Sequence, residues 1–101
     1  MTSQITNLAW LEEFYTGLCD GDWEHTYGID ISNLDNPGWS FEVDLKGTFL
    51  EGLLVEKKTI ERTDNDWIFY TIEDLKFVAR GGPKNLGEII SIFRAFTEDF
   101  E

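Results

Sequence analysis

Apolar residues recur every three or four positions near the start of the chain, which is the spacing of one face of an α-helix. This stripe consists of Leu8, Trp10, Leu11, Phe14, Tyr15 and Leu18. Asn7 immediately precedes the stripe and is expected to cap the helix, because its side chain can accept a hydrogen bond from the first turn. Gly17 and the Asp-Gly-Asp sequence at 20–22 are expected to end the helix near residue 18.

From residue 27 onward the pattern changes to an alternation of apolar and polar positions, which predicts β-strands. The expected strands cover residues 27–31, 39–45, 49–62, 67–72 and 75–80, with a break near Gly52. Before the second strand, Pro37 and Gly38 predict a type II turn, because proline presets its second position and glycine supplies the positive φ of its third. The polar residues 63–66 predict a tight turn between the third and fourth strands.

Gly81, Gly82 and Pro83 end the strand pattern, and a second helical stripe follows. Its members are Leu86, Ile89, Ile90, Phe93 and Phe96. Asn85 and Glu88 have the spacing of a capping box at the start of this helix. The order of helix, strands joined by short turns, and helix predicts an α+β fold with an antiparallel sheet of about four to six strands.

Acidic residues outnumber basic residues, and most of the excess lies in the first half of the chain. Twenty Asp and Glu against eight Lys and Arg give a formal net charge of −12. Residues 1–45 contain no Lys or Arg and nine acids, namely Glu12, Glu13, Asp20, Asp22, Glu24, Asp30, Asp35, Glu42 and Asp44. One interpretation is solubility alone; the other is a surface complementary to a basic partner, whose approach such a field speeds and orients. A nucleic-acid partner is disfavoured because its phosphates would be repelled.

The chain is long enough for one domain, residues 1–101, with a core rich in aromatic residues. Its single cysteine allows no intrachain disulfide, which suits a reducing cytoplasm. The amino terminus lacks the basic start and apolar run of a signal peptide, and no segment approaches the ~20 apolar residues of a membrane span. We therefore expect a cytoplasmic protein without a membrane partner.

The segment CDGDWEHTYGIDI (residues 19–31) concentrates side chains that bind metals or move protons. Acids at positions 20, 22 and 24 alternate as at the start of a calcium loop, but the twelfth position holds Ile31 instead of a bidentate glutamate. Zinc would find one cysteine, Cys19, and one histidine, His25, in the whole chain. We therefore expect no metal ion and no cofactor.

Catalysis by Cys19 or His25 is a second interpretation of the same segment. Cys19 lies near the negative end of the first predicted helix and among acids, which disfavours the thiolate. His25 follows Glu24 on a segment expected to be extended, so the two side chains would point to opposite faces. We expect a small buried cysteine, a structural histidine and no enzyme; the alternative is a small hydrolase or sulfur-transfer enzyme that uses both.

Aromatic residues are interleaved with these acids, notably Trp23, Tyr27 and Trp39. Large aromatic side chains beside desolvated charges are typical of interface hot spots. Trp39 belongs to an alternating strand and is expected in the core. For Trp23 the pattern leaves core and interface equally open.

The segments WLEEFY (10–15), CDGDWEHTYGIDI (19–31), LDNPGW (34–39) and DLKGT (44–48) closely resemble the immunity protein 53 family of bacterial polymorphic-toxin systems. These motifs span the first half of the chain, and the second half matches only in length and order of elements. The resemblance implies a small cytoplasmic protein, encoded beside a toxin gene, that binds and neutralises that toxin. Toxins of such systems are frequently nucleases, whose basic surface an acidic protein can mask.

We therefore expect a stoichiometric, non-catalytic inhibitor whose partner is a cognate toxin encoded by the adjacent gene. The candidate toxin-binding residues are Asp20, Asp22, Trp23, Glu24, Asp30, Asp35 and Glu42. A general protein-interaction module without a toxin is a further alternative. The oligomeric state stays open.

Overall fold

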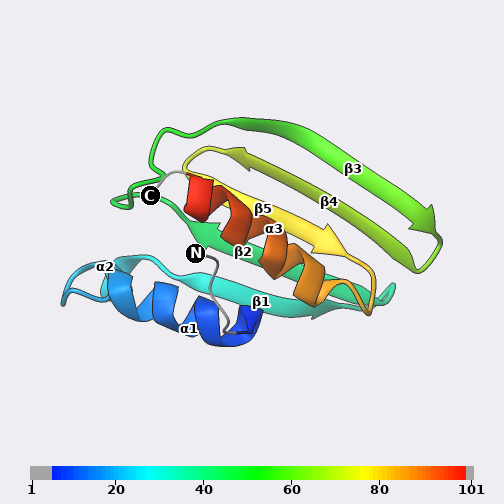
Figure 1. Cartoon of the computed structure of the whole chain (residues 1–101), viewed down its shortest axis with the longest axis horizontal. Coiled ribbons are helices and arrows are strands. Elements are labelled where there is room, and N and C mark those ends of the chain that lie inside the picture. Colours follow the sequence, from blue (N-terminus) through cyan, green and yellow to red (C-terminus); the bar gives the residue numbers. More distant parts are fainter. Residues whose placement is uncertain (1–5, 100–101) are drawn as a thin grey trace.

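Two long helices lie on one face of a five-stranded antiparallel sheet in the computed structural model, which describes residues 6–99 (Figure 1). The elements are α1 (Asn7–Leu18), α2 (Trp23–Thr26), β1 (Ile29–Leu34), β2 (Gly38–Asp44), β3 (Val55–Thr63), β4 (Asp66–Glu73), β5 (Lys76–Gly81) and α3 (Leu86–Asp99). The strand order is β1-β2-β5-β4-β3, so β1 and β3 form the edges of the sheet. The predicted α+β architecture is confirmed.

Alternation along the strands separates an apolar face of the sheet from a charged one. Phe41 of β2 and Phe77 of β5 are fully buried against Phe93 of α3, with ring centroids 5.9 and 5.0 Å from the Phe93 ring. The opposite face carries cross-strand ion pairs. These are Glu42 with Arg80 at 3.0 Å, Glu42 with Lys76 at 3.7 Å and Asp44 with Lys76 at 3.6 Å.

Helix α1 packs on α3 through a subset of its apolar residues. The Phe14 ring meets the Phe93 ring edge-on at 5.2 Å, and the Arg94 guanidinium lies 5.7 Å from the centre of the Trp10 ring. Asn7 accepts a hydrogen bond from Arg94 at 3.2 Å and donates one to the Gly87 carbonyl at 3.2 Å. The side chain of Asn7 thus ties the two helices together.

This use of Asn7 overturns its prediction as the helix cap. The cap is Thr6, whose hydroxyl accepts a hydrogen bond from the Ala9 amide at 3.1 Å. Threonine at this position satisfies one of the amide groups that the first turn leaves without a partner, which frees the Asn7 side chain for α3. The predicted end of the helix at Leu18 is confirmed.

The turn between β1 and β2 also differs from its prediction. The Asn36–Pro37 peptide bond is cis, and Gly38 does not have the positive φ of a type II turn. Glycine is required at position 38 for another reason: a Cβ there would collide with the carbonyl oxygen of Gly81 in β5. The neighbouring Trp39 is half-buried, not fully in the core as expected, and its indole nitrogen donates to the Pro83 carbonyl at 3.0 Å.

Two strands start later than predicted. Residues 23–26 form the short helix α2, which delays the first strand from residue 27 to Ile29 and extends it to Leu34. Residues 49–52 form turns around the fully buried Leu50, residues 53 and 54 are irregular, and β3 starts at Val55. The other strands agree with their predicted ranges within two residues, and Thr63 pairs with Asp66 across the predicted tight turn.

None of the helices within residues 6–99 has the length and apolar character needed to cross a membrane. The expectation that the chain lacks a signal peptide concerns mainly residues 1–5, which lie outside the residues that the structure describes.

Candidate functional site

Two carboxylates of the segment 19–31, those of Asp20 and Glu24, accept hydrogen bonds from backbone amides of the same segment. The Asp20 carboxylate accepts hydrogen bonds from the Trp23 amide at 3.0 Å and the Asp22 amide at 2.9 Å, and these bonds hold the pKa of Asp20 below its usual value. The Glu24 carboxylate accepts from the Asp20 and Gly21 amides, each at 3.0 Å. Both acids therefore close the loop between α1 and α2, while their remaining surface faces solvent.

Trp23 occupies the inner side of the same segment and is 6% exposed. Its indole nitrogen donates to the Lys46 carbonyl at 2.8 Å. Its ring lies 6.4 Å from the Tyr15 ring and 6.2 Å from the Tyr27 ring. Trp23 thus anchors α2 to the loop after β2, so it can support a binding surface but offers little area to a partner.

The remaining candidate acids do not form one cluster. Asp22 precedes β1 and Asp35 follows it, so they lie at opposite ends of this strand, while Asp30 lies on the strand itself; all three are exposed (Figure 1). Glu42 is the cross-strand partner of Asp30, so both project from the charged face of the sheet, but Glu42 differs in being paired with Arg80 and Lys76. The bases of the second half of the chain thus offset acids on β2, and the acids around α1, α2 and β1 keep their excess.

Cys19 and His25 show no catalytic arrangement. Cys19 is half-buried, and its thiol donates to the Tyr15 carbonyl at 3.2 Å. The His25 side chain is 75% exposed, with its Nε2 4.0 Å from a Glu24 oxygen. Cys19 follows the last residue of α1, whereas Glu24 and His25 lie in the helical α2, which corrects the extended geometry expected for these two. Within residues 6–99, no group of three His, Cys, Asp or Glu side chains is placed to hold a metal ion.

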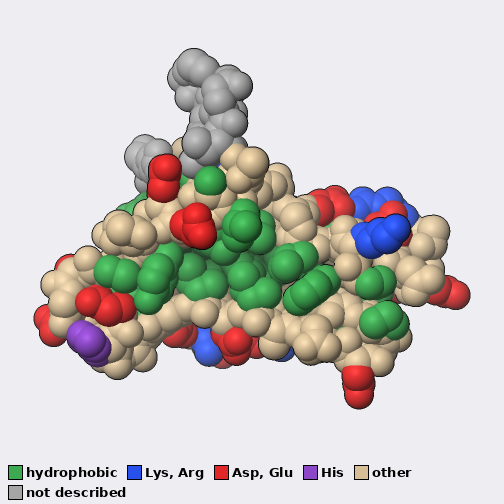
Figure 2. Space-filling model, turned by 90° about the horizontal axis from the view of Figure 1, so that it is seen from below, with side chains coloured by type: hydrophobic (Ala, Val, Ile, Leu, Met, Phe, Trp, Pro, Cys, Tyr) green, Lys and Arg blue, Asp and Glu red, His purple; other side chains and the backbone are tan. Residues whose placement is uncertain are grey.

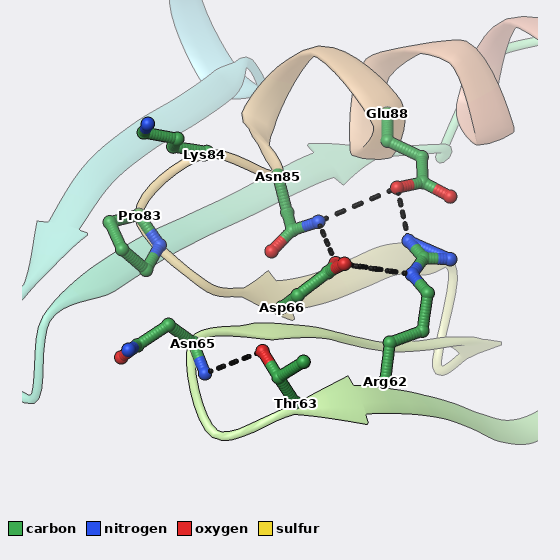
Figure 3. A pocket seen from close by; sticks show the side chains of 8 residues that line it. All are labelled: Arg62, Thr63, Asn65, Asp66, Pro83, Lys84, Asn85 and Glu88. Carbon is green, nitrogen blue, oxygen red and sulfur yellow. Dashed lines mark hydrogen bonds and ion pairs between the residues drawn. The ribbon is translucent and has the colours of Figure 1, made fainter.

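A polar hollow of about 880 Å³ lies between the β3–β4 turn and the loop that leads into α3 (Figure 3). Its lining residues are Arg62, Thr63, Asn65, Asp66, Pro83, Lys84, Asn85 and Glu88. None of them is among the candidate toxin-binding residues given above, and the tight turn predicted at 63–66 is the sequence signal that points to this place.

Most of the charged groups in the hollow are paired with one another. Arg62 donates to Asp66 at 3.1 Å and to Glu88, and the Asn85 amide donates to Asp66 at 3.0 Å and to Glu88 at 3.4 Å (Figure 3). The bonds from Asn85 and Arg62 lower the pKa of Asp66. The Asn85 oxygen accepts from the Trp67 amide at 3.3 Å. The predicted Asn85–Glu88 contact therefore exists. Together with the bonds to Asp66 and Trp67, it joins the start of α3 to the β3–β4 hairpin.

The comparisons with known proteins return one family. A family model described as immunity protein 53 matches residues 8–98. The match extends beyond the amino-terminal motifs and takes in the hairpin and α3. No curated protein and no solved structure matches the chain.

Proposed function

The chain belongs to the immunity protein 53 family, and from this premise we propose that it binds and neutralises a cognate toxin encoded by the adjacent gene. An immunity function follows from the family itself. The proposal adds that inhibition is stoichiometric and non-catalytic, and that it takes place in the cytoplasm of the producing cell. It also adds that the partner is a protein and not a nucleic acid.

The observation that carries the electrostatic part is the distribution of charge. Residues 1–45 hold nine acids and no Lys or Arg, and the exposed Asp22, Asp30 and Asp35 keep their side chains at the surface. A toxin that acts on nucleic acid must present a basic surface to phosphates. An acidic protein is attracted to such a surface and can cover it.

The candidate contacts differ in what they can contribute. The carboxylates of Asp20 and Glu24 already accept backbone hydrogen bonds, but they still add negative charge beside Asp22. Glu42 is neutralised in part by Arg80, and Trp23 is buried. We therefore place the main electrostatic contribution on the exposed acids and a supporting role on Trp23.

The enzyme alternative would require Cys19 and His25 to converge in a pocket. The hollow beside Arg62 is lined by neither of them, and His25 projects into solvent. Nothing in the described geometry favours this alternative over binding.

The experiment is a titration of the toxin from the adjacent gene with this protein. We expect a complex that co-purifies at low salt and toxin activity that falls linearly to zero at a fixed molar ratio. Inhibition without a fixed ratio, or the lack of a complex at low salt, would contradict the proposal. A Cys19→Ser/His25→Asn variant is the control, since it should inhibit like the wild type; a folded variant that no longer inhibits would favour the enzyme.

A further inference from the structure

One face of the molecule combines exposed apolar side chains from α1 and β1. Of the stripe predicted on α1, Leu8 is 60% exposed and Tyr15 is 40% exposed. On β1, Ile31 is 39% exposed. Figure 1 shows α1 running beside this edge strand, and Figure 2 shows hydrophobic side chains joined into a continuous band when the molecule is viewed from that side. Leu8, Tyr15 and Ile31 define what is called the α1–β1 face below.

The packing of α1 explains why these residues are exposed. The helix turns Trp10 and Phe14 toward Phe93, with Trp10 6.0 Å and Phe14 5.2 Å from that ring. The other flank, with Leu8 and Tyr15, is thereby directed away from α3. Strand β1 has only β2 as a neighbour within the described sheet, so its apolar residues lack cover from a further strand.

This band differs from the other exposed apolar residues. Leu54 and Phe49 lie in the loop before β3, and Leu75 lies in the β4–β5 turn. Exposed apolar residues that occur singly on loops are ordinary in soluble proteins. A continuous apolar band that spans a helix and an edge strand is instead characteristic of an interaction site.

The charge around the α1–β1 face selects the kind of partner. Glu12 and Glu13 of α1, Asp30 of β1 and Asp35 of the following turn are all exposed, and residues 1–45 contain no Lys or Arg. A second copy of the chain would bring acids against acids across such a contact, which is unfavourable. A basic protein surface would bring complementary charges to the rim while its apolar side chains cover the band.

We propose that the α1–β1 face is the surface that binds the toxin, with Leu8, Tyr15 and Ile31 at its centre and the acids at its rim. The inference rests on the proposed immunity function and adds the place of contact. It also describes the toxin surface: apolar side chains surrounded by Lys and Arg. An apolar centre with a polar rim is the usual anatomy of a protein interface, in which the centre carries most of the affinity.

The test measures the affinity of a catalytically inactive form of the toxin from the adjacent gene for three purified proteins. These are the wild type, the Leu8→Ser/Ile31→Ser variant and the Leu54→Ser variant. We expect the double variant to bind about 30-fold more weakly or worse, the loss typical of hot-spot residues. Leu54→Ser, which removes a leucine that is 75% exposed on a loop, should bind within about twofold of the wild type.

Circular dichroism and thermal unfolding establish that the variants are folded. If the double variant is not, Leu8→Ser alone serves in its place, because Leu8 is largely solvent-exposed and its loss leaves the core intact; about tenfold weaker binding is then expected. Sedimentation of the free protein is the companion measurement, and a monomer is expected.

The two proposals fail in different ways. If the wild type does not bind the toxin, the proposed function is wrong. If the wild type binds and the folded double variant binds equally well, the function stands and the location is wrong. A dimer of the free wild type that the double variant abolishes would also overturn the location, because a second copy would then occupy the face.

Discussion

The indole nitrogen of Trp23 donates a hydrogen bond to the backbone carbonyl of Lys46 over 2.8 Å, which joins α2 to the loop after β2. Trp23 is surrounded in sequence by acids that face solvent, yet it is itself buried. The segment around it therefore has two sides. The tryptophan holds the junction between α1 and β1 in place, and the acids contribute charge to the surface.

A Trp23→Phe substitution separates these two roles. Phenylalanine keeps most of the buried ring but cannot donate to Lys46, so we expect the free energy of unfolding to fall by about 1 kcal/mol. Urea denaturation measures this change, and calorimetry with the toxin measures binding, which should be retained. A folded variant with unchanged stability and much weaker binding would show instead that the indole contacts the toxin.

Asp20 makes stability depend on pH. Its folded pKa is lowered, because the Trp23 and Asp22 amides donate to the carboxylate, so the unfolded chain binds a proton more readily. This contribution is present above the ordinary aspartate pKa of about 3.9 and is lost as the pH falls through the lower folded value.

In Asp20→Asn the side-chain oxygen can still accept hydrogen bonds, but the charge is gone. We expect the variant to be less stable than the wild type near pH 6, with the difference disappearing at the acid end. Urea midpoints between pH 6 and pH 2 check this expectation. If the urea midpoints of the two proteins changed with pH by the same amount throughout, the expectation would be contradicted.

Electrostatic steering predicts that toxin association depends on salt. The on-rate should fall about tenfold between low salt and 0.5 M salt, because charges more than about 8–10 Å apart are screened at physiological ionic strength and above. Stopped-flow mixing gives this rate directly. A rate that does not change with salt would refute steering and leave the apolar contact untouched.

The effect of where the acids lie can be tested with two variants that each lose two negative charges and so have the same net charge. Asp30→Asn/Asp35→Asn removes two exposed acids from the β1 edge, Asp30 on the side of the strand opposite Ile31 and Asp35 in the turn that follows, and Glu56→Gln/Glu61→Gln removes two from β3 at the other edge of the sheet. The first variant should slow association at low salt more than the second, since nearby charges dominate the attraction. Equal slowing would mean that only the net charge matters.

Arg94 is a buried contact between the two long helices. Its guanidinium lies over Trp10, donates to the Glu98 carboxylate at 3.1 Å in an ion pair and donates to Asn7. Arg94→Met keeps the aliphatic stem and removes these contacts, so we expect a loss of about 2 kcal/mol in thermal or urea unfolding. Glu98→Gln is the control and should cost less than about 1 kcal/mol, because Glu98 is partly exposed. Equal losses would show that the ion pair accounts for the whole effect.

Two glycines should respond to alanine in opposite directions. Gly38→Ala places a methyl group against the Gly81 carbonyl and should lower the unfolding free energy by about 1–3 kcal/mol. Gly17 lies in α1 with nothing near its missing Cβ, so Gly17→Ala should raise stability by about 0.5 kcal/mol. Chemical denaturation of both variants checks the pair. A neutral Gly38→Ala would mean that β2 and β5 can separate without cost.

Part of the candidate site could be predicted from the sequence, and part could not. The acids are visible because charge is a property of composition, and the segment 19–31 lies within the range that matches the family. The burial of Trp23 could not be predicted, because its partner Lys46 lies 23 residues away. The pairing of Glu42 with Arg80 depends on β2 and β5 becoming neighbours, which no local pattern indicates.

The sequence by itself determined the kind and order of the main elements, because helical and strand periodicities are local and are set by which side chains alternate. It also determined the charge asymmetry and the family. Only the tertiary structure decided which apolar residues are covered. Trp10 and Leu8 belong to the same predicted stripe, but Phe93 of α3 lies on the Trp10 side, so Leu8 remains in solvent. Burial is a relation between elements that are distant in sequence, and so the exposed apolar face appears only once the helices and strands are placed together.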